Sequence, residues 1–326
     1  MKRILALFCC VPFLLLAGCG DKDKDPATSD DSSAAARRRI GVGAVSTVTM
    51  HSTDRTRVKV TVAAVLLDTK DRILECEVDE LDYMVTLSGG VPQPVADLTT
   101  KRDKGDAYQP TTEDVGENGD TATPWHEQVD EFCDFVEGKT GAEVSALAAT
   151  DGKNEQIKGC DLILTDFILA VRRAADAATA QDIGSGDDLQ LAVTAARSAS
   201  ATDEKPQYDV EMAAVTLDNG DRISGCMTDT LEAKLTVTDG VFTTVSSGIQ
   251  SKREMGDAYG MKNASGIKRE WYEQADAFAT YARGKTAAQL AGVQLEDNGK
   301  TDAVAGCTID IRRMLQNTVK AAREDG

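Results

Sequence analysis

The chain is similar to itself, and this internal similarity constrains its fold more than any other feature. Residues 63–68 recur as 213–218, 101–108 as 252–259, 125–128 as 271–274 and 138–140 as 284–286. Gly159-Cys160 also matches Gly306-Cys307, and all offsets lie between 146 and 151 residues. Because the blocks keep one order and nearly one spacing, the sequence predicts two tandem copies of one domain, over residues 40–180 and 188–326.

Each copy is predicted to open with strands. Apolar side chains alternate with more polar neighbours over residues 58–66 and 208–214, which is the period of a half-buried strand. The apolar members are Val58, Val60, Val62, Ala64 and Leu66, and then Tyr208, Val210, Met212 and Ala214. Asn219-Gly220 favours a tight hairpin into a return strand through Ile223. We expect three or four antiparallel strands in each copy.

The later part of each copy has helical periodicity. Apolar side chains recur at three- and four-residue steps at Trp125, Val129, Phe132 and Val136, and at Trp271, Ala275, Phe278 and Ala282. Gly138 and Gly284 are suited to end these helices, and Thr140 and Thr286 have the capping-box spacing that starts another. A last amphipathic helix is predicted within residues 311–323. Strands followed by helices make the predicted fold class α+β.

The first eighteen residues predict an export signal that takes no part in the fold. Lys2 and Arg3 precede an apolar run over residues 4–16. The ending Leu16-Ala17-Gly18-Cys19 resembles a bacterial lipoprotein box, which implies a diacylglyceryl group on Cys19; an ordinary signal peptide is the alternative. Residues 19–39 are polar and are predicted to be a flexible linker. The resemblance implies a lipid-anchored protein on the cell membrane, outside the cytoplasm.

The charge of the chain argues against some partners. The formal net charge is −18 at pH 7, and loss of Lys2 and Arg3 with the signal takes it to −20. Such an acidic protein is not expected to bind nucleic acid or anionic lipid headgroups broadly. A phosphate loop, a Gly-x-Ser-x-Gly elbow and a His-Glu-x-x-His motif are all missing, so the sequence does not indicate a hydrolase or kinase.

Five cysteines follow Cys19, and their spacing predicts no metal site. Cys76 and Cys160 hold the places that Cys226 and Cys307 hold in the second copy, whereas Cys133 has no counterpart. Two interpretations stay open for each pair: a disulfide, which would close a loop of about 80 residues, or buried thiols. Cys133 is expected in the core. The paired spacings of zinc ribbons are lacking, and with two histidines in the chain a His-rich metal site is not expected.

The loop Asp302-Ala303-Val304-Ala305-Gly306-Cys307-Thr308 precedes the last helix. It resembles the flavin-attachment motif of the FMN-binding-domain family, which comprises extracytoplasmic electron carriers. The resemblance implies that a flavin transferase would join FMN through its phosphate to Thr308, with Asp302, Gly306 and Cys307 forming the attachment loop. Ala305 and Cys307 depart from the family pattern, which usually has Ser and Ala there. In the first copy Asp161 replaces Thr308, so the second copy is the expected flavin domain.

Basic and aromatic residues precede this loop. Lys252, Arg253, Lys262, Lys268 and Arg269 make a local excess of positive charge, and Tyr259, Met261 and Trp271 offer apolar surfaces. Lys252 and Tyr259 are the predicted secondary contacts of the flavin. The alternatives are a solvated charged face and a core position for Trp271. The sequence thus leaves two functions: a membrane-tethered flavoprotein that relays electrons between redox partners, or a flavin-free surface lipoprotein that binds a small ligand or a protein.

Overall fold

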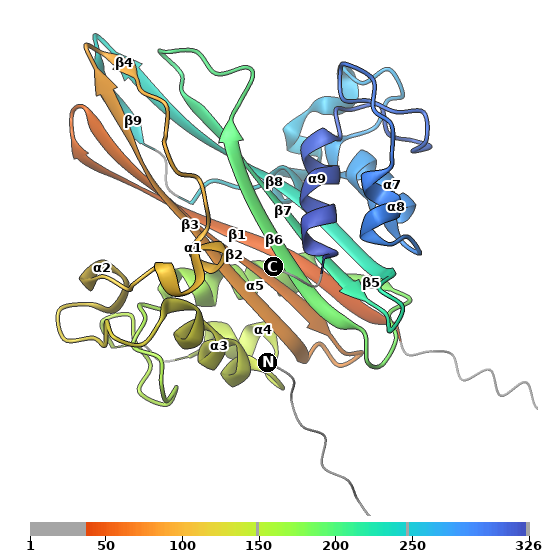
Figure 1. Ribbon diagram of the computed structural model, residues 1–326, viewed down its shortest axis with the longest axis horizontal. Helices are drawn as coiled ribbons and strands as arrows, with labels where there is room; N and C mark the ends of the chain where they lie inside the picture. Colours follow the sequence, from red (N-terminus) through yellow and green to blue (C-terminus); the bar gives the residue numbers. More distant parts are fainter. Residues whose placement is uncertain (1–36, 148–149, 246–247, 324–326) are drawn as a thin grey trace, which may run out of the picture. The chain divides into compact units, whose positions relative to one another are not determined.

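The alternating stretches form antiparallel β-sheets, each followed along the chain by helices (Figure 1). The computed structural model describes residues 37–147, 150–245 and 248–323. The predicted signal peptide, Cys19 and the linker residues up to position 36 lie outside these ranges. Two antiparallel sheets with their helices confirm the α+β class.

The described elements fall into two series of the same kind. The strands are β1 (Arg38–Ser52), β2 (Arg55–Leu67), β3 (Ile73–Ser88), β4 (Val91–Pro92), β5 (Thr179–Gln181), β6 (Asp188–Arg197), β7 (Gln207–Leu217), β8 (Ile223–Thr238) and β9 (Val241–Val245). The α-helices are α1 (Lys101–Lys104), α2 (Thr112–Val115), α3 (Trp125–Val136), α4 (Gly141–Ser145), α5 (Thr165–Ala177), α6 (Lys252–Met255), α7 (Trp271–Ala282), α8 (Ala287–Ala291) and α9 (Arg312–Ala321). Short 3-10 helices are η1 (Gly105–Ala107), η2 (Gly256–Tyr259) and η3 (Met261–Asn263).

The two sheets have closely similar pairing. The strand order is β4-β3-β2-β1-β5 in the first and β6-β7-β8-β9 in the second. Val65 pairs with Cys76 across β2 and β3, and Val215 pairs with Cys226 across β7 and β8. Each ladder then shifts register just before its hairpin, ahead of Leu67 in one and Leu217 in the other. Both halves therefore share a strand register as well as an element order.

The predicted hairpin at Asn219-Gly220 is present, but its left-handed residue differs from the usual one. Asp221, and not the glycine, has a positive φ of 56°. The carboxylate of Asp218 accepts the N–H groups of Gly220 and Arg222 at 2.8 and 3.0 Å, which holds this wider loop. Aspartate tolerates the left-handed region better than most residues, so the loop needs no glycine there.

One core joins the two sheets. The alternating residues of β2 and β7 lie on the inner faces, where Val58, Val62, Val210 and Met212 belong to a single buried cluster. Tyr83 of β3 packs against Tyr208 of β7 with their ring centroids 5.1 Å apart. The described residues between 37 and 323 belong to one compact unit, so the predicted ranges 40–180 and 188–326 each supply one sheet to a shared core.

Helices cover the outer face of each sheet, on opposite sides of the sheet pair (Figure 1). Helix α5 lies so close to β1 that a Cβ on Gly41 would be 2.0 Å from the carbonyl oxygen of Ala174. A Cβ on Gly43 would be 2.4 Å from the backbone nitrogen of Ala174. These glycines permit the close approach of helix and strand.

The predicted helix boundaries are largely confirmed. The apolar positions listed for α3 and α7 are all buried, and Gly138 and Gly284 follow these helices with positive φ. Thr140 and Thr286 form the predicted capping boxes of α4 and α8. Strand β1 starts at Arg38, inside the stretch predicted as linker, because Arg38 and Arg39 pair with β5. No helix in the described ranges is long and apolar enough to cross a membrane.

Candidate functional site

Lys252 occupies the centre of a partly buried cluster in the second half. It is the first residue of α6, and the side chain of Ser251 caps that helix. Its Nζ lies 3.3 Å from Glu232 Oε1 and 5.3 and 5.4 Å from the ring centroids of Tyr259 and Trp271. Burial lowers the pKa of Lys252, but Tyr259, Glu232 and Glu211 raise it by more, so the lysine stays charged. The structure therefore places the predicted pair Lys252 and Tyr259 together, with Trp271 beside them.

A cavity of about 350 Å³ opens next to this cluster. Its lining comes from strands β7 and β8, from Lys252 and Trp271, and from the first turn of α9. The lining residues are Ser198, Ala199, Ser200, Asp209, Glu211, Thr230, Lys252, Trp271, Asp310, Arg312, Arg313 and Met314. Small-ligand sites in proteins start at about 300 Å³, so this cavity suits a small molecule.

Glu211 is the carboxyl group of this cavity whose pKa departs furthest from its ordinary value. The Thr230 hydroxyl donates to its Oε2 at 2.7 Å across the β7–β8 ladder. Burial raises the pKa of Glu211 to about 7, although the hydrogen bond from Thr230 and the charge of Lys252 oppose this. A carboxyl group that titrates near neutral pH in a cavity is typical of functional sites.

Arg313 brings a second cation from the start of α9. Its Nη2 donates to the carbonyl oxygen of Arg197 at 3.1 Å, and its Nη1 lies 3.5 Å from Asp209 Oδ2. This Nη1 is buried and makes no hydrogen bond to any residue in the described ranges. Arg312 is exposed and lines the same cavity. The cavity thus has a guanidinium nitrogen whose hydrogen-bonding capacity is unused by those residues.

The predicted attachment loop contacts α7 at Gln274, one turn after Trp271. Thr308 is exposed, and its N–H and hydroxyl both donate to Gln274 Oε1, at 2.9 and 3.2 Å. Gly306 has a φ of +83°, and a Cβ there would be 2.4 Å from Arg269 Nη1, which donates to the Gly306 carbonyl at 3.4 Å. Cys307 is buried and Asp302 is exposed. The loop is therefore shaped by Gly306 and held by Gln274.

The predicted site residues form two neighbouring groups rather than one cluster. Trp271 and Gln274 are three residues apart on α7, so they share a helix face. Asp310 lines the cavity and follows Thr308 by two residues, so their Cα atoms lie within about 7 Å. The attachment loop therefore borders the cavity.

Sequence reasoning missed Asp209, Glu211 and Arg313. One signal was present, because Asp209 and Glu211 precede Ala213 and Val215 on the outer face of β7. Charged residues on a face whose other positions are buried in the core are unusual and mark a polar site. Arg313 gives no comparable signal in the sequence, because its pairing partner is about 100 residues away.

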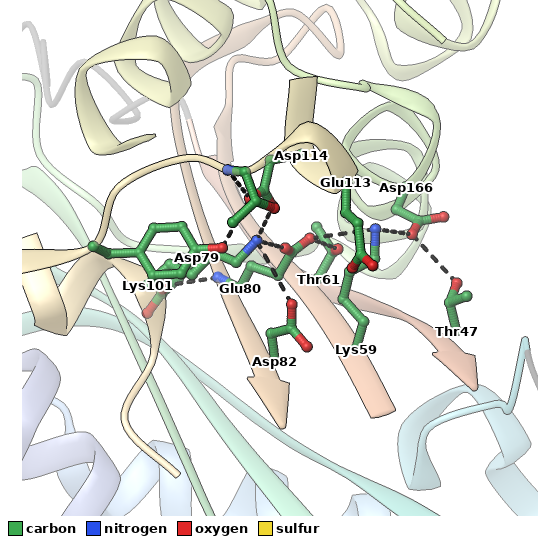
Figure 2. A network of polar contacts seen from close by, with 12 residues as sticks. Thr47, Lys59, Thr61, Asp79, Glu80, Asp82, Lys101, Glu113, Asp114 and Asp166 are labelled. Atoms are coloured by element: carbon green, nitrogen blue, oxygen red, sulfur yellow. Dashed lines mark hydrogen bonds and ion pairs between the residues drawn. The ribbon is translucent and has the colours of Figure 1, made fainter. Parts of the chain in front are cut away.

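The same position in the first half is closed by ion pairs (Figure 2). Lys101 Nζ lies 2.5 Å from Glu80 Oε1, pairs with Asp114 and is 4.0 Å from Asp82 Oδ2. Its side chain is 1% exposed and lies over the rings of Tyr108 and Trp125. Both halves therefore place a lysine over a tyrosine and a tryptophan. Ion pairs fill the space beside the lysine in the first half, whereas a cavity lies there in the second half.

Two polar pairs are exchanged between the halves. Thr61 donates to Glu80 across β2 and β3 at 2.7 Å, whereas Thr230 donates to Glu211 across the matching strands with the residue types swapped. Lys59 Nζ lies 3.0 Å from Asp166 Oδ2 at the start of α5, as Figure 2 shows. At the matching places Asp209 faces Arg313, so the charges are reversed.

Comparison with protein-family models, with curated proteins and with solved structures finds no match to this chain. Within the described ranges, no three His, Cys, Asp or Glu side chains come together in a group that could hold a metal ion. The residues around the second-half cavity and the neighbouring loop are therefore the candidate functional residues.

Proposed function

We propose that the two halves are diverged tandem copies of one domain, carried on a lipid anchor outside the cytoplasm. The shared register, the shared placement of Lys101 and Lys252 over an aromatic pair, and the exchanged pairs support the copies. An exchange that keeps an interaction while swapping its partners is expected when two copies drift under the same packing constraint. The N-terminal sequence supports the anchor.

We propose that the second copy is a binding domain whose cavity takes a small organic acid. One observation carries this proposal: the cavity of about 350 Å³ is lined by the cations Lys252, Arg312 and Arg313, where the first half is filled. The Nη1 of Arg313, which makes no hydrogen bond within the described part of the chain, offers a donor to a carboxylate, and charge-assisted bonds of this kind are among the strongest in proteins. Trp271 gives the ligand an apolar wall.

The lining acids limit what the cavity accepts. Asp209 partly neutralises Arg313, and Asp310 is 3.8 Å from Arg312. A ligand with several negative charges would therefore meet repulsion, whereas a monocarboxylate would meet a near-neutral site with local donors. Because Glu211 titrates near neutral pH, such a ligand is expected to bind more tightly when Glu211 is protonated.

The test is binding of small monocarboxylates and dicarboxylates to residues 20–326, by calorimetry and by thermal denaturation. A ligand at 100 times its Kd would stabilise the protein by about 2.7 kcal/mol and raise its Tm by several degrees. Arg313→Gln should weaken binding about tenfold or more, since it removes a charged hydrogen bond. Lys104→Gln, which breaks a pair with Asp97 in the first half, is the control and should bind normally. A panel that leaves the Tm unchanged at millimolar concentrations would refute an organic-acid site.

A second candidate function, electron transfer through covalent FMN, is favoured by the loop of Thr308. Thr308 is exposed, and Arg269 lies beside Gly306 of the same loop, so the donor set suits a phosphoryl group. The ammonium of Lys252 lies over the rings of Tyr259 and Trp271, so a flavin stacked on that side of the rings would compete with it. A bound FMN would supply one- and two-electron redox chemistry between a membrane donor and an outer acceptor.

Intact mass decides between these functions. Residues 20–326 would be exported together with a flavin transferase, beside a Thr308→Ala control. A gain of one FMN that the control lacks would establish Thr308 as the acceptor. No gain, with the transferase active on a known target, would remove covalent flavin and leave the organic-acid site.

A further inference from the structure

Two buried thiols outside the candidate site lie in one cluster under the first sheet. Cys76 is on the outer face of β3 and Cys133 is on α3, and both belong to the buried cluster between that sheet and its helices. The neighbouring Cys76 thiol, followed by burial, raises the pKa of the Cys133 thiol well above its usual value. Both are free thiols in this structure, and they are 6% and 5% exposed.

The second half gives independent support for this geometry. Cys226 matches Cys76, and Ala279 holds the place of Cys133. Cys226 and Ala279 line the same small cavity, so the strand and helix positions face each other there too. The first half fills this space with a second sulfur, whereas the second half leaves it open.

We propose that Cys76 and Cys133 are a disulfide site that locks α3 onto β3 when the protein folds outside the cytoplasm. The pairing differs from the one that internal similarity suggested, Cys76 with Cys160, because α3 places Cys133 against Cys76. Thiols on facing positions of a strand and a helix are near enough to be candidates for a bridge, and the predicted export signal implies a compartment in which bridges persist. Burial of both groups means that the bond would form during folding.

The chemistry needs an oxidant of the disulfide class. One thiolate attacks the oxidant's disulfide and forms a mixed disulfide, releasing one thiol of the oxidant. The other cysteine, after loss of its proton, attacks this bond, forms the Cys76–Cys133 bridge and releases the second thiol. The two cysteines lose two protons and two electrons, and the oxidant is reduced to two thiols.

The first test is peptide mapping of the exported full-length chain after alkylation of free thiols. We expect a linked peptide pair that contains Cys76 and Cys133, while Cys160, Cys226 and Cys307 are alkylated. Alkylation of all five, or a link from Cys76 to Cys160, would overturn the proposal. Refolding of residues 20–326 in oxidised and reduced glutathione repeats the test without depending on where the protein is located in the cell.

Two variants separate the bridge from ordinary packing. Cys133→Ala copies the residue of the second half and should fold, lose the linked peptides and no longer respond to reductant. Ala279→Cys should create a second linked pair with Cys226. In the unaltered protein, reductant should lower the Tm by roughly 5–10 °C, as expected for a bridge that closes a loop of this length. An equal Tm with and without reductant, together with failure of Ala279→Cys to form a bridge, would show that the paired positions cannot be linked.

Discussion

Lys101 provides the sharpest test of how the first half is stabilised. Lys101→Met keeps a long flexible side chain but removes the cation from between Glu80 and Asp114. These carboxylates are 2% and 5% exposed, so the substitution leaves two negative charges buried beside each other. Breaking a buried pair from one side costs about 3–5 kcal/mol, and we expect the free energy of unfolding to fall by that amount.

The matched control is Lys252→Met in the second half. Its side chain is 15% exposed, and one carboxylate, Glu232, lies within 4 Å among the described residues. Water in the neighbouring cavity can solvate what the lysine leaves, so the expected loss is about 1–2 kcal/mol. Urea unfolding at pH 7 with an unchanged m-value would measure both differences.

The pH dependence of the loss gives an internal check. Burial raises the pKa of Asp114, but Lys101 together with the hydrogen bonds from Thr111 and Tyr108 lowers it by more and leaves it below its usual value. A lowered carboxyl pKa stabilises the fold above its unfolded value and loses this contribution as the pH falls through the folded value. In the variant this carboxyl should protonate more easily, so the cost of Lys101→Met should shrink as the pH falls from 7 towards 4. A loss below about 1 kcal/mol at pH 7, or one equal to that of Lys252→Met, would refute the account.

Three further predictions concern single contacts. Burial raises the pKa of Glu211 to about 7. Its contribution to stability is therefore present below the pKa of the unfolded chain and is lost as the pH rises through 7. In urea unfolding, Glu211→Gln should become more stable relative to the unaltered protein between pH 5 and 8. Asp209→Lys and Arg313→Asp should each destabilise by about 1 kcal/mol, and the double variant, which copies the first half, should recover most of this in a double-mutant cycle. Gly41→Ala should cost roughly 2 kcal/mol or more in the same assay, because its Cβ would be 2.0 Å from the Ala174 carbonyl oxygen; a neutral effect would mean that α5 can move away.

Local signals in the sequence predicted the local structure. Helices α3 and α7 follow from their apolar period, and their ends follow from Gly138 and Gly284, because these features act over a few residues. Strand β1 was not placed, because glycine is disfavoured in strands, and Gly41 and Gly43 are needed to let α5, more than 120 residues later, approach the strand. The shared core between the sheets was also missed. Nothing in one strand's alternation tells whether its apolar face meets a helix or another sheet.

The candidate site was predictable only where its residues belong to local patterns in the sequence. Lys252 and Trp271 stand in blocks that the chain repeats, and the structure places them together. Glu211 and Arg313 are brought to the cavity by β7 and α9, which are about 100 residues apart in sequence. Their meeting depends on the sheet being formed first and the last helix packing on it, which a single sequence does not display.

One source of the difference between the halves is the loop after the lysine helix. In the first half this loop forms α2, and its Asp114 turns toward Lys101 while also accepting the N–H of Thr111. In the second half the buried acid of the loop, Glu270, instead accepts the N–H groups of Met261 and Lys262 at 2.8 and 3.0 Å.

Glu270 thus accepts hydrogen bonds from the backbone of its own loop and does not pair with Lys252. Lys252 keeps one close carboxylate, Glu232, among the described residues. A lysine with one acid can share its charge with a ligand, whereas Lys101 is already matched by several acids and is sealed from water. The change of this loop acid, together with Thr230 in the place of Glu80, therefore explains why the two halves can share a fold and still divide its uses, with the first stabilising the structure and the second proposed to bind a ligand.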